Sequence, residues 1–399
     1  MDQSRCEHLW VAIIAGGQGT RLFPISNPER PKQFCQLDEK NTFIQAVIEH
    51  FTTIGVKSTQ IVVITTTSDQ TKLAREQVVP RGVLSQNIFE ISARYGYAGS
   101  MVKAAEIIED LDPEAIIINT PSDQHLVVDD NFNETINNAV MAAEKGEAVI
   151  VGVKVNDLVT AMGCGHAVYG MTHDPDSGCF PVLGFVEKPK KQEADRLMRS
   201  GNSACNTGIN VWCPQRLLQH VRSSKLGNSG IATDVMMKKL GDVKIAVGTF
   251  SWYDCGTLKS FYEISKKSPN HKNASLGGGT FERIDCRRSL LYAEPGMELR
   301  VAGAEDDAVL FTMIGEQPII VVAHLAESQR IKALAEDFLA HEDFLTEDFS
   351  FGARNNTVLC SNISDQLIAG FVGVENYATY VTKEPDGRLV AIVSQQKRR

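Results

Sequence analysis

Four short, nearly all-apolar runs recur between residues 11 and 152, and amphipathic stretches separate them. The runs are VAIIA (11–15), IVVIT (61–65), AIIIN (115–119) and AVIVG (148–152). Strands without polar alternation are buried on both faces, as in sheets whose strands are joined by crossover helices. The pattern therefore predicts an α/β chain with a Rossmann-like, mostly parallel sheet and helices on both faces. Ligands of such sheets bind beyond the carboxyl ends of the strands.

The chain changes character near residue 266. The segment KKSPNHKNASLGGG (266–279) is polar and holds a proline and three consecutive glycines, which is typical of a linker. Beyond it, short β-runs follow one another closely, and the stretches 286–324 and 357–394 resemble each other loosely, as in a degenerate repeat. We therefore predict two domains, residues 1–272 with the α/β pattern and a smaller β-rich C-terminal domain of residues 273–399.

Composition narrows the class of protein further. No apolar run reaches the roughly 18 residues that cross a bilayer, so we expect no membrane partner. Nine cysteines without a Cys-x-x-Cys pair favour reduced thiols in a cytoplasm and argue against zinc or a disulfide framework. A formal net charge of −9 disfavours an extended nucleic-acid footprint. An anionic ligand would therefore need locally placed cations or a metal.

A glycine-rich turn follows the first predicted strand, within VAIIAGGQGTRLFP (11–24). Glycines at 16, 17 and 19 let backbone N–H groups approach a phosphate closely, and Arg21 and Lys32 add cations suited to phosphate oxygens. A dinucleotide-binding loop would need glycine where Leu22 stands, and a Walker A loop would need lysine where Thr20 stands. Both are excluded. A glycine turn after a strand is also common for structural reasons alone, but the two cations favour a phosphate ligand.

These residues carry a family resemblance. GGQGTRLFP followed by PKQF (31–34) resembles the signature of the sugar-1-phosphate nucleotidyltransferases, and the Lys-Gln-Phe variant resembles the mannose-1-phosphate guanylyltransferases in particular. Further segments follow in the order that the family has them: PSDQ (121–124), FVEKP (185–189), SGNSACNTGI (200–209) and WYDCGT (252–257). The resemblance covers about residues 9–340 and implies that residues 1–272 form the catalytic domain.

The resemblance also implies roles for individual residues. The nucleoside triphosphate, with GTP the leading candidate, would be bound by Gly16, Gly17, Gly19, Thr20, Arg21 and Lys32. Mg²⁺ would be held by Asp123 and Asp254, which with Arg21 and Lys32 form the catalytic set. The sugar 1-phosphate would be contacted by Gly165, Glu187, Lys188 and Asn206. The β-rich C-terminal segment would serve a homodimer.

Each of these residues also has a structural interpretation. Asp123 follows Pro121 and Ser122 and could cap a helix or turn, Asp254 could be a solvated turn residue, and Glu187 and Lys188 could form a surface pair. The reaction itself needs positioning and charge neutralisation rather than a protein nucleophile or base. His125 and His166 are therefore interpreted as structural. Two isolated aspartates suit magnesium, which takes one or two carboxylates plus phosphate oxygens and water.

The sequence departs from the family at the segments that contact base and sugar. SARYGYAGSMVKAA (92–105) and AMGCGHAVY (161–169) lack most of the expected polar residues, and Cys205 stands where the family has tryptophan. Mannose 1-phosphate is the leading substrate, and the departures leave open a different sugar or a cyclitol phosphate. A catalytically silent subunit that senses nucleotide sugars is the other alternative. Silent paralogues would be expected to lose a residue of the catalytic set, and this chain keeps all four.

Overall fold

The computed structural model describes residues 6–17, 22–38, 40–223, 243–284, 286–302, 304–314, 317–326, 368–372, 377–383 and 389–395. Contacts divide the chain into two compact units, each described by itself below. Unit 1 comprises Met1–Gly16 and Ile44–Asp254, and unit 2 comprises Gly17–Phe43 and Cys255–Arg399. The boundary predicted between residues 272 and 273 differs from this division, because residues 17–43 and 255–272 group with the C-terminal part.

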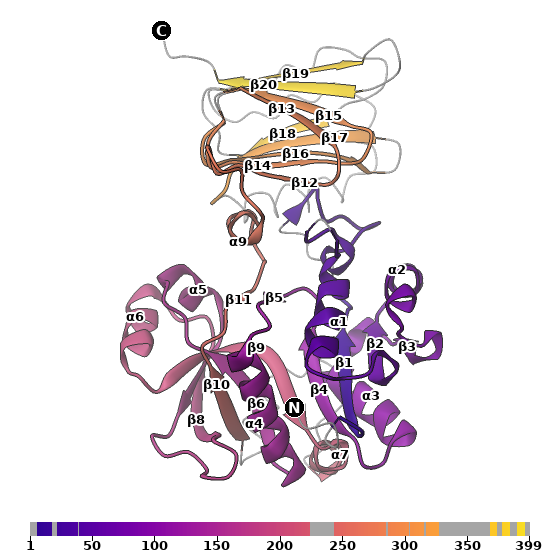
Figure 1. Ribbon diagram of the computed structural model, residues 1–399, viewed down its shortest axis with the longest axis vertical. Coiled ribbons are helices and arrows are strands. Elements are labelled where there is room, and N and C mark those ends of the chain that lie inside the picture. Colours follow the sequence, from indigo (N-terminus) through magenta and orange to yellow (C-terminus); the bar gives the residue numbers. More distant parts are fainter. Residues whose placement is uncertain are drawn as a thin grey trace. The chain divides into compact units, whose positions relative to one another are not determined.

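A nine-stranded sheet forms the centre of unit 1, in the order β3-β2-β1-β4-β9-β6-β10-β8-β7 (Figure 1). Among its described strands, all but β8 and β9 run in the same direction. The predicted α/β fold with helices around a mostly parallel sheet is therefore confirmed. The strands are β1 (Leu9–Ile14), β2 (Ile61–Thr65), β3 (Ile88–Glu90), β4 (Ile116–Pro121), β6 (Ala148–Val153), β7 (His166–Tyr169), β8 (Phe180–Val186), β9 (Ser203–Trp212) and β10 (Val243–Gly248).

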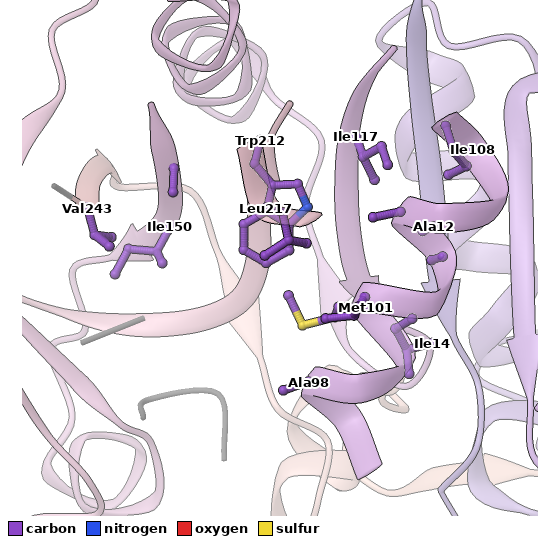
Figure 2. Close-up of a cluster of buried hydrophobic side chains, with 14 of the residues drawn as sticks. Ala12, Ile14, Ala98, Met101, Ile108, Ile117, Ile150, Trp212, Leu217 and Val243 are labelled. Carbon is purple, nitrogen blue, oxygen red and sulfur yellow. The ribbon is translucent and has the colours of Figure 1, made fainter. Parts of the chain in front are cut away.

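Helices cover both faces of this sheet. Ala12 and Ile14 of β1 point to a cluster that also contains Met101 of α3 and Leu217 of α7, and Figure 2 shows this packing. The alternate residues of β1 are equally buried and point to the opposite face, because successive strand side chains alternate. The helix α4 contacts β4, β6, β9 and β10. The α-helices of this unit are α1 (Phe43–Thr53), α2 (Ser68–Val78), α3 (Gly96–Leu111), α4 (Asp130–Glu144), α5 (Leu158–Gly163), α6 (Lys191–Arg199) and α7 (Pro214–Ser223).

Capping side chains fix where several of these helices begin. The side chains of Thr67, Asp129 and Asp157 accept hydrogen bonds from backbone N–H groups in the first turns of α2, α4 and α5. Short 3-10 turns lie at η2 (Lys32–Phe34), η3 (Ser58–Gln60), η4 (Val79–Arg81), η5 (Ser85–Asn87) and η6 (Ala93–Tyr95). Within the described residues, no helix combines the length and hydropathy that crossing a membrane requires.

Unit 2 contains α9 (Leu258–Ile264) and two β-sheets, with strand orders β12-β14-β16-β17-β18 and β13-β15-β20-β19 (Figure 1). From β12 to β16 the chain alternates between the sheets, and each strand pairs in parallel with the next strand of its own sheet, 16 or 18 residues further on. With this register the chain winds repeatedly around one core and passes from one sheet to the other in each turn. The strands are β12 (Ala274–Leu276), β13 (Thr280–Ile284), β14 (Leu290–Ala293), β15 (Glu298–Ala302), β16 (Asp307–Ile314), β17 (Gln317–His324), β18 (Ile368–Val372), β19 (Tyr377–Lys383) and β20 (Leu389–Gln395).

The glycine-rich segment expected to be a linker is folded within unit 2. It includes β12, and its glycines turn the chain from one sheet to the other. Gly277 has φ +93°, and a Cβ on it would lie 2.3 Å from the carbonyl oxygen of Ala293. Backbone passes so closely here that only glycine fits. The polar, glycine-rich composition that predicts a linker therefore belongs to a tight turn between the two sheets of unit 2.

Candidate active site

The first strand ends in the predicted glycine turn, at the carboxyl edge of the sheet. A Cβ on Gly16 would lie 2.5 Å from the Cγ2 atom of Thr66, and the Thr66 hydroxyl donates a hydrogen bond to the Gly16 carbonyl at 3.2 Å. Gly16 is therefore required by packing against the residue that follows β2. The backbone N–H of the preceding residue, Ala15, donates to the Ile64 carbonyl of β2 at 2.7 Å, which fixes the start of the turn.

The next part of the turn belongs to unit 2. Gly17 is exposed, and a Cβ placed on it would meet none of the described residues within 4 Å. Its carbonyl accepts a 3.0 Å hydrogen bond from the Gln33 side chain. Lys32 begins η2 and is 3% exposed, with its Nζ 5.2 Å from the Phe43 ring centroid. Gly19, Thr20 and Arg21 lie outside the described residues.

A two-stranded ribbon brings the two predicted magnesium carboxylates to one end. The strands β5 (His125–Leu126) and β11 (Trp252–Tyr253) pair antiparallel, with Tyr253 opposite His125. One further step places Asp254 opposite Gln124, whose neighbour is Asp123. The Trp252 indole N–H donates to the Gln124 side chain at 2.7 Å, which joins the strands at this end. Asp123 is half-buried and Asp254 is exposed.

The register of the large sheet places Asp123 at the same edge as the glycine turn. Ile14 of β1 pairs with Pro121 of β4, so Gly16 and Asp123 each stand two residues beyond a paired position. The carboxyl ends of parallel strands gather ligand-binding residues at such an edge. The Gln124 side chain donates to the Thr120 hydroxyl at 2.9 Å and thereby ties the ribbon to the end of β4.

Tyr97 at the start of α3 is a site residue that the sequence reasoning missed. Its hydroxyl donates to the Gly208 carbonyl at 3.1 Å. Burial raises the pKa of Tyr97 far above its ordinary value, and the nearby Asp123 carboxylate raises it further, so the hydroxyl stays a donor. Gly208 has φ +79°, and a Cβ on it would lie 2.8 Å from the ring of Pro121. Tyr97 lies in the segment 92–105, which departs from the family pattern. That departure is the sequence signal that could have identified it.

Three of the four predicted sugar-phosphate residues lie together. The Asn206 backbone N–H donates to the Gly165 carbonyl at 2.8 Å, and the Asn206 side-chain oxygen accepts from the Gly208 N–H at 2.9 Å. A Cβ on Gly165 would lie 2.6 Å from the Oε2 atom of Glu187, so this carboxylate passes directly over the glycine. Gly208 also accepts the hydrogen bond of Tyr97, so these three residues adjoin Tyr97, which lies near Asp123.

Lys188 is the fourth residue, and it pairs with Glu187 at 3.8 Å between Nζ and Oε1. The two side chains are 66% and 63% exposed, so the ion pair itself contributes little to stability. Lys188 has φ +41°, in the left-handed region that lysine rarely adopts. Both side chains therefore remain accessible to an anionic ligand, on a loop that begins where β8 ends.

The expectation that all cysteines are reduced is wrong at one place. Cys164 and Cys205 form a disulfide with an S–S distance of 2.14 Å. They flank Gly165 and Asn206, and the Nε2 atom of His166 lies 3.7 Å from both sulfurs. The 41 residues between the two cysteines conceal the pairing, which depends on β9 lying beside β7. Other cysteines among the described residues, such as Cys35 and Cys179, are free and buried.

His166 is held by protein contacts, as predicted for a structural histidine. Its Nε2 lies 2.8 Å from the Ala161 carbonyl oxygen, which can only accept a hydrogen bond, so Nε2 carries the proton. Its Nδ1 lies 3.0 Å from the Ser203 hydroxyl. Although Cys164, His166 and Cys205 have the spacing of metal ligands, thiolates rather than disulfide sulfurs bind metals. This group is not a metal centre in the disulfide state.

The two aspartates fit a magnesium ion better. Mg²⁺ prefers hard oxygen ligands and keeps waters and phosphate oxygens beside one or two carboxylates. Asp123 and Asp254 supply two carboxylates at one end of the ribbon, and Asp254 is exposed to solvent. The donor set therefore suits Mg²⁺ in the presence of a bound polyphosphate.

Comparison with known proteins assigns the chain to a family. The family model described as nucleotidyl transferase matches residues 11–271, which include the glycine turn, both aspartates and the sugar-side group. The chain belongs to the nucleotidyl transferase family. The predicted enzyme class is thereby confirmed, and the site residues stay predictions carried by their geometry.

Curated relatives of this nucleotidyltransferase include two mannose-1-phosphate guanylyltransferases. The protein from Sinorhizobium fredii is 25% identical over 362 residues, covering 83% of this chain and 68% of the relative. The protein from Escherichia coli K12 is 26% identical over 373 residues, covering 85% and 75%. A crystal structure from Thermus thermophilus, described as a mannose-1-phosphate geranyltransferase, has the same fold, with a TM-score of 0.68 at 22% identity over 83% of this chain and 99% of that chain.

Proposed function

We propose that this nucleotidyltransferase joins a sugar 1-phosphate to a nucleoside triphosphate and releases pyrophosphate, with mannose 1-phosphate and GTP as the leading pair. One observation carries the proposal. Within unit 1, Tyr97 connects the two groups of predicted site residues. It lies near Asp123 of the aspartate pair, and its hydroxyl donates to Gly208, whose N–H donates to Asn206 of the sugar-side group. The names of the curated relatives support the choice of mannose 1-phosphate and GTP.

The reaction needs charge neutralisation and alignment more than acid–base chemistry. A phosphate oxygen of the sugar 1-phosphate attacks the α-phosphorus of the triphosphate, and the bond from that phosphorus to the bridging oxygen of the β-phosphate breaks. The attacking monoester has a second pKa near ~6 and is mostly dianionic at neutral pH. No protein base is required, which agrees with the engagement of His166 by backbone and hydroxyl partners.

The proposed roles combine the family resemblance with the positions of the described residues. Gly16 and Gly17 present the backbone of the turn to the triphosphate, and Arg21 and Lys32 offset its charge. Asp123 and Asp254 would hold Mg²⁺, which when bound supplies positive charge against the phosphates. Lys188 would meet the phosphate of the sugar substrate. Glu187 would accept hydrogen bonds from the sugar hydroxyls, and the Asn206 side-chain amide could donate to them. Tyr97 fixes the Gly208 carbonyl and so positions the strand that carries Asn206.

A different sugar or a cyclitol phosphate is the second candidate, and the disulfide favours it. Cys164 and Cys205 bracket the sugar-side group with soft, poorly directional sulfur where the family pattern has polar or aromatic residues. Loss of hydrogen-bonding groups changes selectivity by orders of magnitude while leaving the chemistry intact. Mannose 1-phosphate would then be a poor substrate relative to a less hydroxylated ring.

Pyrophosphate release across a panel of triphosphates and phosphorylated sugars tests the proposal. GTP, ATP, UTP and dTTP are each combined with mannose 1-phosphate, glucose 1-phosphate, a deoxyhexose 1-phosphate and a cyclitol phosphate. We expect Mg²⁺-dependent release that is highest with GTP and mannose 1-phosphate. Preference for another sugar supports the second candidate. Absence of release with every pair, from a folded protein that still binds a nucleotide sugar, would establish the silent subunit instead.

A further inference from the structure

A cavity of about 500 Å³ lies within unit 2, lined by residues that have no part in the proposed reaction. Three segments form it: residues 37, 38 and 40, residues 264–269 at the end of α9, and residues of β12 and β13. Its volume lies within the range of small-molecule sites, roughly 300–1,000 Å³. None of the family segments identified in the sequence falls on its lining.

Cations dominate the charged side chains of this cavity. Among the described residues of its lining, four are cations, Lys40, Lys266, Lys267 and Arg283, and one is a carboxylate, Asp38. In a chain of net charge −9, this is a local reversal of sign. Like charges gathered around a low-dielectric hollow focus the field and attract a ligand of opposite charge. The cavity therefore favours an anion that carries more than one charge.

Hydrogen bonds hold the walls in place before any ligand binds. The Asp38 carboxylate accepts from the backbone N–H groups of Lys40 and Asn41 at 2.7 and 2.8 Å, so it structures the loop. The Arg283 guanidinium donates to the Ser275 hydroxyl at 2.9 Å, across β12 and β13. Lys267 donates to the Glu263 carbonyl at the end of α9 at 2.8 Å. A preformed site avoids the entropic cost of ordering its walls on binding.

Aliphatic side chains form the rest of the lining. Leu37, Ile264, Pro269 and Leu276 contribute, and Leu37 is buried. Inorganic anions gain nothing from such a surface, whereas an organic ring gains by leaving water. The lining therefore matches a ligand with phosphate groups at one end and an uncharged ring system at the other.

We propose that this cavity binds a nucleoside diphosphate unit, free or esterified to a sugar. The cations at 40, 266 and 283 take the two phosphates, and the aliphatic side chains cover the nucleoside. This site is independent of the proposed function, because its lining contains no residue to which a catalytic or substrate-binding role is assigned.

Hydrogen–deuterium exchange on the full chain tests the proposal, because it reports where a ligand binds. GDP, UDP, ADP and GDP-mannose are the nucleotide probes, and pyrophosphate and guanosine test the two halves of the ligand separately. We expect a nucleoside diphosphate to protect backbone amides in residues 264–276, pyrophosphate to do so only at ~10-fold or higher concentration, and guanosine to give no protection. Comparison of GDP with GDP-mannose then separates the free from the esterified unit.

Paired variants make the result specific. Lys40→Gln/Lys266→Gln removes two cavity cations, and Lys259→Gln/Lys272→Gln removes two cations of unit 2 outside the lining, with the same change in net charge. The first pair should raise the Kd of the nucleoside diphosphate at least ~10-fold, because charge-assisted hydrogen bonds are lost. Arg283→Gln should act in the same direction. Equal affinity in both pairs, protection confined to residues outside 264–276, or pyrophosphate binding as tightly as the nucleotides would overturn the proposal.

Discussion

Replacement of Gly165 by alanine should damage the sugar-phosphate site without damaging the fold. The added Cβ would lie 2.6 Å from the Oε2 atom of Glu187, whereas ordinary contacts begin at 3.4 Å. The carboxylate must therefore retreat by about 0.8 Å, and a misplacement of about 1 Å in a site costs on the order of 10²-fold in rate. Gly165 does not have a positive φ, so alanine can adopt its backbone conformation.

The kinetic signature of Gly165→Ala should be asymmetric. We expect kcat/KM for the sugar 1-phosphate to fall ~10- to 100-fold, while the KM for the nucleoside triphosphate changes less than about threefold. Initial rates of pyrophosphate release, with one substrate varied and the other saturating, measure both values. Thermal unfolding should give a Tm within about 2 °C of the parent protein.

Gly163→Ala is the matched control, two residues away. A Cβ on Gly163 would meet nothing within 4 Å, so this variant should keep the kinetic constants of the parent protein. If Gly165→Ala and Gly163→Ala gave the same kinetic constants, the placement of Glu187 over the sugar site would be refuted. A large loss of Tm in Gly165→Ala alone would show that the glycine is needed for folding instead.

Three further predictions concern stability and substrate binding. Gly208→Ala should destabilise the protein by about 1–3 kcal/mol in urea unfolding, since it has φ +79° and its Cβ would lie 2.8 Å from a proline ring carbon; an unchanged midpoint would contradict this. Burial lowers the pKa of His50 to about 3. The unfolded chain therefore binds more protons than the folded chain below pH 6.5, and the free energy of unfolding should fall as the pH is lowered from 6.5 toward about 3. His50→Asn should lose this share of the slope between pH 7.5 and 5.5, and identical slopes would argue against a buried neutral ring. Lys32→Ala should impair turnover and triphosphate binding together, whereas Lys188→Ala should mainly raise the KM for the sugar 1-phosphate; equal effects of both variants on both substrates would contradict separate roles.

The sequence predicts β1, β2, β4 and β6 of unit 1 because each coincides with a short, nearly all-apolar run. It does not predict that β9 lies antiparallel between β4 and β6, because that pairing joins residues far apart in the chain. In unit 2 the β-runs are evident, but their parallel register is not, since coil spacings of 16 and 18 residues leave little repetition to detect. The glycine corner at 277–279 has the composition of a linker and the geometry of a turn.

In the candidate site too, single motifs are evident from the sequence, whereas contacts between distant residues are not. The motif PSDQ and the motif WYDCGT identify the two aspartates separately, and only the pairing of β5 with β11 brings them to one end. Tyr97 was missed because its role depends on Gly208, more than a hundred residues away. The pairing of Cys164 with Cys205 was missed for the same reason, and composition suggested the opposite.

Magnesium-dependent turnover of aspartate variants measures whether Asp123 and Asp254 hold the metal ion that the proposed reaction needs. Asp123→Asn and Asp254→Asn are compared with Asp195→Asn, which removes a carboxylate of α6 that is 47% exposed and pairs with Arg199. The assay measures pyrophosphate release from GTP and mannose 1-phosphate over a Mg²⁺ titration. We expect each site variant to keep the parent Tm and to lose at least ~10²-fold in kcat/KM, while Asp195→Asn stays within about twofold of the parent protein. Turnover and Mg²⁺ dependence near those of the parent protein in either site variant would contradict this expectation.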